Sequence, residues 1–278
     1  MRRFRALVEL TRAPAALTVL GDSVTGAVSA GRRLRGRRAV LPAASAAAYW
    51  AGMVLNDWAD REVDAAERPE RPIPSGRIEP VLALGLAAGL GGAGLLIGAA
   101  AGRSRQATAL LVSVIGYDVV FKPNPAGPVS MAACRALDVL LGGGRDSWPA
   151  AARVAAHTWA VTSLSRGEVH GASPRTAATA AAVTGLITAS LPLGCASPAH
   201  RAAVVSLGTA YAGAVGGPQW RARADPRAAR VREATRRGVH GTVLLQAALS
   251  ARRNLPAAAA LVAVLPAIEL LGRKVSPT

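Results

Sequence analysis

Three kinds of residue are scarce in this 278-residue chain, and the scarcity of two of them argues against a class of protein or site. Aromatic residues make up only 4% of the sequence, and they are not interleaved with a basic domain, which argues against a nucleic-acid surface. The two cysteines, Cys134 and Cys195, are too few for a disulfide framework or a zinc site. Lysine occurs only at positions 122 and 274, so arginine supplies nearly all the positive charge.

Apolar residues are abundant: they form 51% of the chain, against 18% charged residues. The charges fall in clumps between apolar runs of about 17–24 residues, the length needed to span a bilayer. The net charge of +17 would suit a nucleic-acid binder, but the arginines lie at the ends of the apolar runs. We therefore expect an integral membrane protein whose partner is the lipid bilayer and not a nucleic acid.

Backbone groups inside lipid must be satisfied internally, so apolar spans of this length predict helices. The fold class expected is an all-α, polytopic membrane bundle of nine to ten transmembrane helices. The first half of 229–250 holds four arginines and is expected to lie on the membrane surface. The predicted spans are 11–30, 39–59, 79–101, 106–121, 127–143, 149–165, 174–194, 199–216, 229–250 and 255–272.

Orientation follows from the basic residues of the connecting segments. With the N-terminus inside, the inner segments hold 20 Lys and Arg residues and the outer ones 12. This predicts a cell-membrane protein with both termini cytoplasmic, although the cluster Arg32–Arg38 opposes it. The loops 60–78, 122–126, 166–173 and 217–228 would then share the cytoplasmic side. The alternative for the N-terminus is a cleaved signal peptide ending before Gly31.

The segment NDWADREVDAAERPERPIPSGR, at 56–77, gathers carboxylates at the end of an apolar run. Asp57, Asp60 and Asp64 are spaced i, i+3, i+7, which places them on one helix face, with Asn56 beside them. A carboxylate in a membrane helix costs about 2.5–3.5 kcal/mol, and Mg²⁺ would offset that cost. The following arginines suit phosphate oxygens. The plainer alternative is a solvated acidic and basic loop laced by salt bridges.

The motif NDxxDxxxD followed by RPIPSG resembles the first aspartate-rich motif of the UbiA superfamily of intramembrane prenyltransferases. The segment RAPAALTVLGDSVTGA resembles that family's first helix, and YDVVFKPNPAGP resembles its tyrosine and lysine segment. Together with LSRGEVHG, the pattern is most similar to the EboC-like branch. The resemblance covers about residues 8–250. It implies a single membrane domain over 1–278, nine helices around a central cavity, and 255–272 as an added helix.

The resemblance implies Mg²⁺-dependent transfer of a prenyl group from an isoprenyl diphosphate to an acceptor within the membrane. Loss of diphosphate would leave an allylic cation, shielded from water by an apolar cavity. The implied metal ligands are Asn56, Asp57, Asp60, Asp64 and Glu168, with Asp57, Asp60 and Glu168 as the catalytic residues. The implied diphosphate contacts are Asn56, Arg68, Arg71, Lys122 and Arg166.

The second motif departs from the family pattern, which has DxxxD where this chain reads TSLSRGEVHG. Ser165 replaces the first aspartate, and Glu168 is the remaining carboxylate. Three explanations are open: Glu168 holds a second metal, Arg166 replaces the charge of a lost metal, or catalysis has been lost. His170 is an acceptor-side base or a solvated loop residue. We expect Ser165, Arg166 and Glu168 to face the first motif across one cavity, with carboxylate oxygens of the two motifs within about 8 Å.

Charge within a membrane span indicates function by default, and four such residues stand out. Arg135 and Asp138 are functional, or they form a structural pair that bridges helices. Asp118 is a candidate for a missing metal ligand, and Asp22 faces a partner that the sequence does not identify.

The rival to the enzyme is a non-catalytic membrane protein of the same fold, acting as a transport or export component. The altered second motif supports the rival, and the intact first motif supports the enzyme. The acceptor and the prenyl chain length cannot be deduced from the sequence. Aromatic acids, quinone precursors, tetrapyrroles and polyols are all conceivable, and a polar, sugar-like or cyclitol acceptor is one guess.

Overall fold

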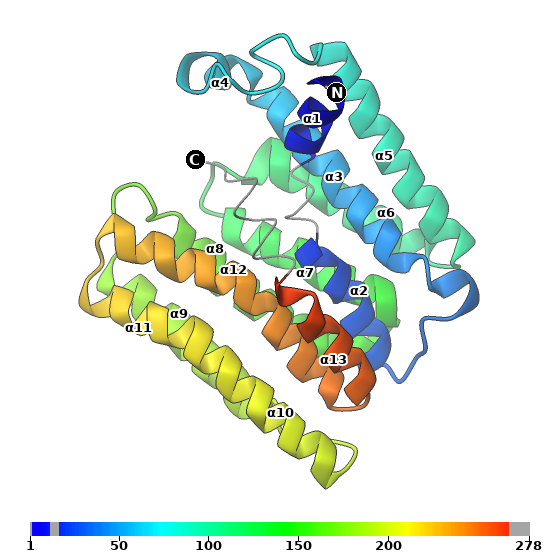
Figure 1. The fold of residues 1–278 in the computed structure, drawn as a ribbon, viewed down its shortest axis with the longest axis vertical. Helices are drawn as coiled ribbons and strands as arrows, with labels where there is room; N and C mark the ends of the chain where they lie inside the picture. Colours follow the sequence, from blue (N-terminus) through cyan, green and yellow to red (C-terminus); the bar gives the residue numbers. More distant parts are fainter. Residues whose placement is uncertain (1, 12–16, 267–278) are drawn as a thin grey trace.

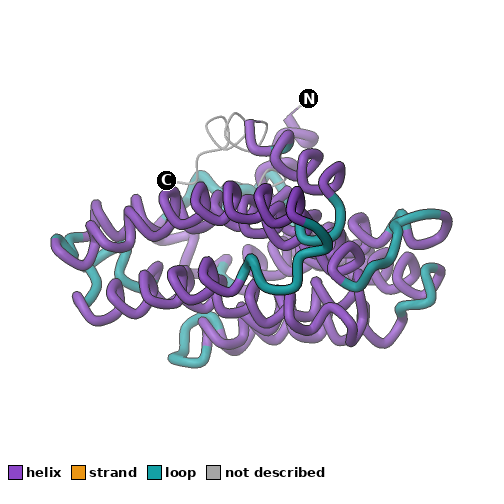
Figure 2. Tube along the Cα trace, turned by 90° about the horizontal axis from the view of Figure 1, so that it is seen from below, coloured by secondary structure: helices purple, strands orange, loops and turns teal. Residues whose placement is uncertain are grey.

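The computed structural model describes residues 2–11 and 17–266, and within these ranges every regular element is helical (Figure 2). The helices are α1 (Arg2–Leu10), α2 (Leu17–Ser29), α3 (Leu41–Ala59), α4 (Arg61–Glu67), α5 (Pro80–Ala100), α6 (Ser104–Gly116), α7 (Gly127–Gly143), α8 (Trp148–Ser165), α9 (Pro174–Ser190), α10 (Pro198–Tyr211), α11 (Gly217–Ala224), α12 (Ala228–Ala251) and α13 (Leu255–Ala263). Two π-helical turns, Tyr117–Phe121 and Ala212–Gly216, extend α6 and α10, and short 3-10 turns lie at Gly36–Arg38 and Gly144–Ser147.

Proline and small polar residues set many of the helix starts. Proline occupies the first turn of α3, α5, α7, α8, α9, α10, α11 and α13, where its missing N–H would have no helical partner in any case. Ser173, Ser197 and Asn254 each precede such a proline-started helix and accept a hydrogen bond from a backbone N–H of the first turn. These residues fix where the helices begin, and so they fix the ends of the bundle at which the loops lie.

The helices form two sides joined by a central group (Figure 1). Helices α3, α5 and α6 lie on one side and α9, α10 and α11 on the other, with α2, α7, α8 and α12 between them. Glycine permits the closest approach in the centre: a Cβ at Gly26 of α2 would lie 1.9 Å from the Val139 carbonyl oxygen of α7. Small residues therefore replace aromatic packing in this aromatic-poor chain.

The predicted spans coincide with helices, but two of the predicted loops contain helices as well. Residues 60–78 were expected to form a loop, but Arg61–Glu67 is helical. Residues 217–228 were expected to form a loop, but Gly217–Ala224 is helical. Pro218 follows the π-helical turn, where regular bonding is already interrupted, so its missing N–H does not end the helix. The expected surface segment at the start of 229–250 is part of the continuous helix α12. Parts of the spans 11–30 and 255–272 lie outside the described residues.

Two helical segments of the described chain are long and apolar enough to cross a membrane by length and composition, Gly36–Ala59 and Pro80–Ala100. The all-α fold class is therefore confirmed, whereas the number of nine to ten membrane crossings stays a prediction.

Charged residues buried in the middle of the bundle bridge the helices. Asp22 of α2 lies 2.8 Å from Arg135 Nε of α7 and accepts a 2.6 Å hydrogen bond from Gln246 Nε2 of α12. Asp138, on the same helix as Arg135, accepts a hydrogen bond from Ser45 of α3. Arg135 and Asp138 thus each bind a different neighbouring helix, in agreement with the structural interpretation and not with a pair to each other. The partners of Asp22 are Arg135 and Gln246.

These contacts predict opposite outcomes for two similar substitutions. Asp22→Asn should lower the free energy of unfolding by about 3–5 kcal/mol, because it leaves the Arg135 charge buried without its partner. Asp138→Asn should be neutral or stabilising, because it removes a buried negative charge that forms no ion pair with the described residues. The amide oxygen can still accept from Ser45, and the lost charge offsets the cost of the unpaired amide group. Thermal unfolding of both variants in detergent tests this, and equal losses would contradict it.

Candidate functional site

The acidic motif lies where α3 ends and α4 begins. Asn56 and Asp57 belong to the last turn of α3, and Asp60 is the junction residue with φ −82° and ψ 1°. Backbone bonds continue across it, because Asp60 N donates to Asn56 O at 2.9 Å and Asp64 N donates to Asp60 O at 2.8 Å. The chain thus stays close to helical through the junction, and the spacing brings Asp57 and Asp64 to a common partner.

That partner is Arg71, in the loop after α4. Its Nη1 lies 2.6 Å from Asp64 Oδ2 and 3.5 Å from Asp57 Oδ1. Asp57 and Asp64 are 5% and 4% exposed, so one guanidinium compensates two buried carboxylates. The loop is held in this position by the burial of Ile73 and Ile78, which pack in one cluster with residues of α1, α3 and α5.

Lys122 binds the other half of the motif. Its Nζ donates to Asn56 Oδ1 at 2.5 Å and lies 2.8 Å from Asp60 Oδ2. Both the Lys122 and Asp60 side chains are 40% exposed, so this pair is open to solvent, unlike the pairs made by Arg71. The motif therefore has a buried half, Asp57 and Asp64, and an accessible half, the Asp60–Lys122 pair, to which the buried Asn56 is bound.

A glycine and a π-helical turn together bring Lys122 to α3. The turn Tyr117–Phe121 carries the chain into Lys122, whose N–H donates to Tyr117 O at 2.9 Å. A Cβ at Gly52 of α3 would lie 2.3 Å from Val114 Cγ1 and 2.5 Å from Asp118 Oδ2, so a larger residue here would displace these side chains from α3. Asp118 accordingly packs against α3 one turn before Asn56. Sequence reasoning missed Gly52, although a glycine in an otherwise bulky helix segment is a sign of close backbone approach.

The loops expected on one side of the membrane do meet at one end of the bundle. Lys122 joins 122–126 to the acidic motif, and Arg166 Nη1 donates to Asn124 O at 2.8 Å. Arg232 Nη1 donates to Glu168 O at 2.8 Å, and Ala172 N donates to Pro226 O at 3.0 Å. The two motifs are therefore linked through the 122–126 loop.

The side chains of the remaining predicted site residues make no contact with the acidic motif that the structure shows as a hydrogen bond or ion pair between described residues. Ser165 Oγ donates to Thr162 O of its own helix at 2.9 Å, and His170 is exposed. The Arg68 side chain is exposed, and the Glu168 side chain is partly exposed; neither forms a hydrogen bond or ion pair with the described residues. A cavity shared by the two motifs and the 8 Å separation of their carboxylates stay predictions.

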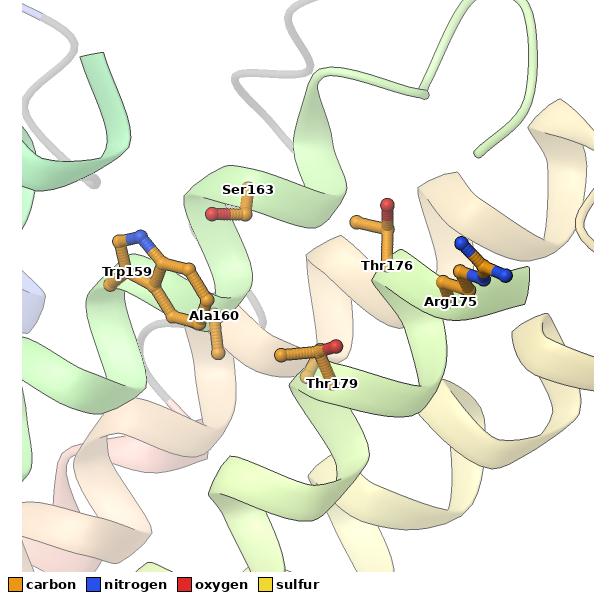
Figure 3. A pocket seen from close by; sticks show the side chains of 7 residues that line it. Trp159, Ala160, Ser163, Arg175, Thr176 and Thr179 are labelled. Atoms are coloured by element: carbon orange, nitrogen blue, oxygen red, sulfur yellow. The ribbon is translucent and has the colours of Figure 1, made fainter. Parts of the chain in front are cut away.

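A hollow of about 270 Å³ lies elsewhere, between α8 and α9 (Figure 3). Trp159, Ser163, Arg175, Thr176 and Thr179 line it, together with Ala160 and Ala180. None of these residues belongs to the acidic motif, so the hollow does not connect the predicted site residues.

Residues 25–236 match the UbiA prenyltransferase family. The chain belongs to this family. The digeranylgeranylglyceryl phosphate synthase of Methanopyrus kandleri is 40% identical over 114 residues, covering 41% of this chain and 42% of the relative. The synthase of the same name from Ignicoccus hospitalis is 43% identical over 120 residues, covering 41% and 38%. The protoheme IX farnesyltransferase of an Anaeromyxobacter species is 33% identical over 99 residues, covering 35% and 33%.

The matched segments thus span about two fifths of the length of the first of these relatives. A solved chain from a study of digeranylgeranylglyceryl phosphate synthase in membranes covers 90% of this chain and 98% of its own, with a TM-score of 0.68. At 16% identity that likeness shows the fold alone. The resemblance to the UbiA superfamily is therefore confirmed, and the narrower EboC-like branch stays a prediction.

The two halves of the acidic motif should differ in their effect on stability. Asp64→Asn should lower the free energy of unfolding by about 3 kcal/mol, because it removes the nearer partner of Arg71 from a buried site. Asp60→Asn, which breaks a solvent-exposed pair, should change it by less than about 1 kcal/mol. Denaturation in detergent measures both, and a larger loss in the Asp60 variant would refute the division into buried and accessible halves.

Proposed function

We propose that this protein is an intramembrane prenyltransferase that takes its prenyl group from an isoprenyl diphosphate. The observation that supports this most directly is the accessible half of the acidic motif, where Lys122 binds Asn56 and Asp60. A lysine, an amide and a carboxylate converge there at the exposed end of the bundle. Membership of the UbiA prenyltransferase family supports the same activity.

The donor set suits Mg²⁺, although the acidic motif is not a ready-made metal cage. No group of three or more acidic, histidine or cysteine side chains in the described ranges is arranged to hold a metal ion. Mg²⁺ usually takes one or two protein carboxylates and completes its shell with substrate phosphates and water. Asp60 and Asp57 would supply those carboxylates and Asn56 an amide oxygen. Asp64 would act through Arg71, to which it is bound at 2.6 Å.

The motif's charges explain why a metal and a diphosphate would bind together. Three carboxylates, Asp57, Asp60 and Asp64, are compensated by two cations, Arg71 and Lys122. Mg²⁺ would supply Lewis-acid stabilisation of the leaving diphosphate. Mg²⁺ would also compete with the two cations for the same carboxylate oxygens. That competition would free the Lys122 ammonium and part of the Arg71 guanidinium to bind phosphate oxygens. The exposed Arg68 would add a third cation as diphosphate enters.

The second motif would contribute mainly positive charge. Arg166 lies against the loop that carries Lys122, because its guanidinium binds the Asn124 carbonyl. From there it is placed to approach the same diphosphate. Glu168 retains an uncommitted carboxylate, which we propose as the ligand of a second ion.

The acceptor that fits the relatives best is a glycerophosphate lipid. Two of the relatives described above bear the name digeranylgeranylglyceryl phosphate synthase. In such a reaction the bond between the allylic carbon and the diphosphate oxygen breaks. The acceptor's hydroxyl oxygen forms the new ether bond and releases its proton, and diphosphate leaves. We further propose that the end of the bundle carrying both motifs faces the cytoplasm, with both termini on that side.

The activity assay uses purified protein with Mg²⁺, geranylgeranyl diphosphate and geranylgeranylglyceryl phosphate, with products measured by mass spectrometry. Asp60→Asn and Lys122→Gln should each lower kcat by about 100-fold or more, because each removes charge stabilisation of the leaving group. The control is Glu62→Gln, an exposed carboxylate on α4 that pairs with Arg61 and should leave kcat unchanged.

If diphosphate is released but the glycerophosphate is not prenylated, the acceptor is wrong and the transferase stands. Aromatic acids and polyols are then the next acceptors to supply. If no diphosphate is released with any of these acceptors, the transferase is refuted and the non-catalytic membrane component takes its place.

Replacing Glu168 tests the second motif. Glu168→Gln should raise the Mg²⁺ concentration for half-maximal activity several-fold, because one ligand of the second ion becomes neutral. His170→Gln, two residues further along the same loop, is the matched control. An unchanged Mg²⁺ dependence in the Glu168 variant would show that this carboxylate holds no metal.

A further inference from the structure

The end of the bundle opposite the acidic motif carries a concentrated positive charge. It lies at the start of α3, about 28 Å along that helix from the motif. Asp146 is the only carboxylate in the segments that meet there, 30–40, 101–105, 144–147 and 252–254. The ten arginines of these segments are Arg32, Arg33, Arg35, Arg37, Arg38, Arg103, Arg105, Arg145, Arg252 and Arg253.

Contacts between these segments show that they lie together. Arg32 Nη2 is 2.8 Å from Asp146 Oδ2, which joins the loop after α2 to the turn after α7. A Cβ at Gly31 would lie 3.5 Å from Arg253 Nη1, and one at Gly102 would lie 3.8 Å from Arg37 Nη2. The single carboxylate is thus already paired, and Arg37 and Arg253 lie beside the same segments.

Arg103 differs from the rest because it is buried. It is only 9% exposed, and its Nε and Nη2 atoms have no hydrogen-bond partner among the described residues. The backbone of Gly144 makes room for it, since a Cβ there would lie 2.9 Å from Arg103 Nη1. Leaving donors of a charged group buried and unpaired is costly, so an acceptor from outside the protein would stabilise Arg103 here.

The surroundings of Arg103 increase the demand for an anion. Burial lowers the pKa of Arg103, and the neighbouring guanidinium groups of Arg32 and Arg38 lower it further. Asp146 acts in the opposite direction and more weakly. Three guanidinium groups therefore face one region with a single carboxylate at its edge.

We propose that Arg103, with Arg32 and Arg38, forms a binding site for a phosphate group, supplied by the headgroup of an anionic phospholipid in the adjoining leaflet. Phosphate oxygens would accept from the Arg103 guanidinium, whose planar fork suits phosphate best. Basic pockets between membrane helices bind lipid headgroups in this way. The site is separate from the acidic motif and does not depend on the proposed transfer reaction.

The test is thermal unfolding of the purified protein in a neutral detergent with dioleoylphosphatidylglycerol, dioleoylphosphatidylcholine or inorganic phosphate. The anionic lipid, at about 100 times its Kd, should raise the Tm of the unchanged protein by roughly 5–10 °C. Arg103→Gln and the half-buried Arg38→Gln should lose most of that increase. Arg105→Gln, an exposed neighbour in the first turn of α6, is the matched control and should keep it.

If Arg103→Gln folds poorly, Arg38→Gln still decides the question. An equal loss in the Arg105 variant would mean non-specific attraction to a basic surface and would overturn the site, as would an equal effect of phosphatidylcholine. No increase with either the anionic lipid or inorganic phosphate would also overturn it. An increase with inorganic phosphate that Arg103→Gln abolishes supports the phosphate site and identifies free phosphate as a ligand.

Discussion

Two buried carboxylates, Asp57 at the end of α3 and Asp64 in α4, must be compensated within the protein, and this requirement organises the whole end of the bundle. Arg71 meets it by turning back from the loop after α4 to Asp57 and Asp64. That return fixes the loop, and the buried Ile73 and Ile78 secure it against α1, α3 and α5. With the buried half of the motif satisfied, Asn56 and Asp60 remain for Lys122 and for ligands. An acidic motif in a membrane protein can thus be structural on one side and accessible to solvent on the other.

Charge compensation also explains the differences among the protein's polar sites. In the bundle centre, Asp22 and Arg135 compensate each other, and Gln246 completes the bonding of Asp22. At the acidic motif, Arg71 and Lys122, from the loops after α4 and after the π-helical turn, compensate the carboxylates. At the arginine-rich end compensation is incomplete, because Asp146 pairs with Arg32 and leaves Arg103 without an acceptor. The first arrangement suits a permanent scaffold, and the other two suit ligands that bring charge with them.

Local spacing predicted most of the helices and the common side of Asp57 and Asp64, but not α4 and α11, which lie in segments expected to be loops. Apolar length predicted the helices, and the i, i+7 spacing predicted that Asp57 and Asp64 would share a side. The position of Arg71 was not predictable, since Arg68 lies in the same loop and yet stays exposed. The approach of Lys122 depends on Gly52, which is 70 residues away in the chain. Arg103 and Arg105 look equivalent in sequence, and only tertiary packing buries one of them.

The π-helical turn Tyr117–Phe121 also bears on how this site can change over evolutionary time. A π-helical turn holds one more residue than the α-helical turn that it replaces. Each residue of an α-helix rotates the chain by about 100°, so losing one residue here would turn Lys122 away from Asn56 while leaving α6 intact. A single-codon deletion could therefore disconnect the lysine from the acidic motif without unfolding the bundle. Such a deletion offers a short route from a catalytic member of this fold to a non-catalytic one.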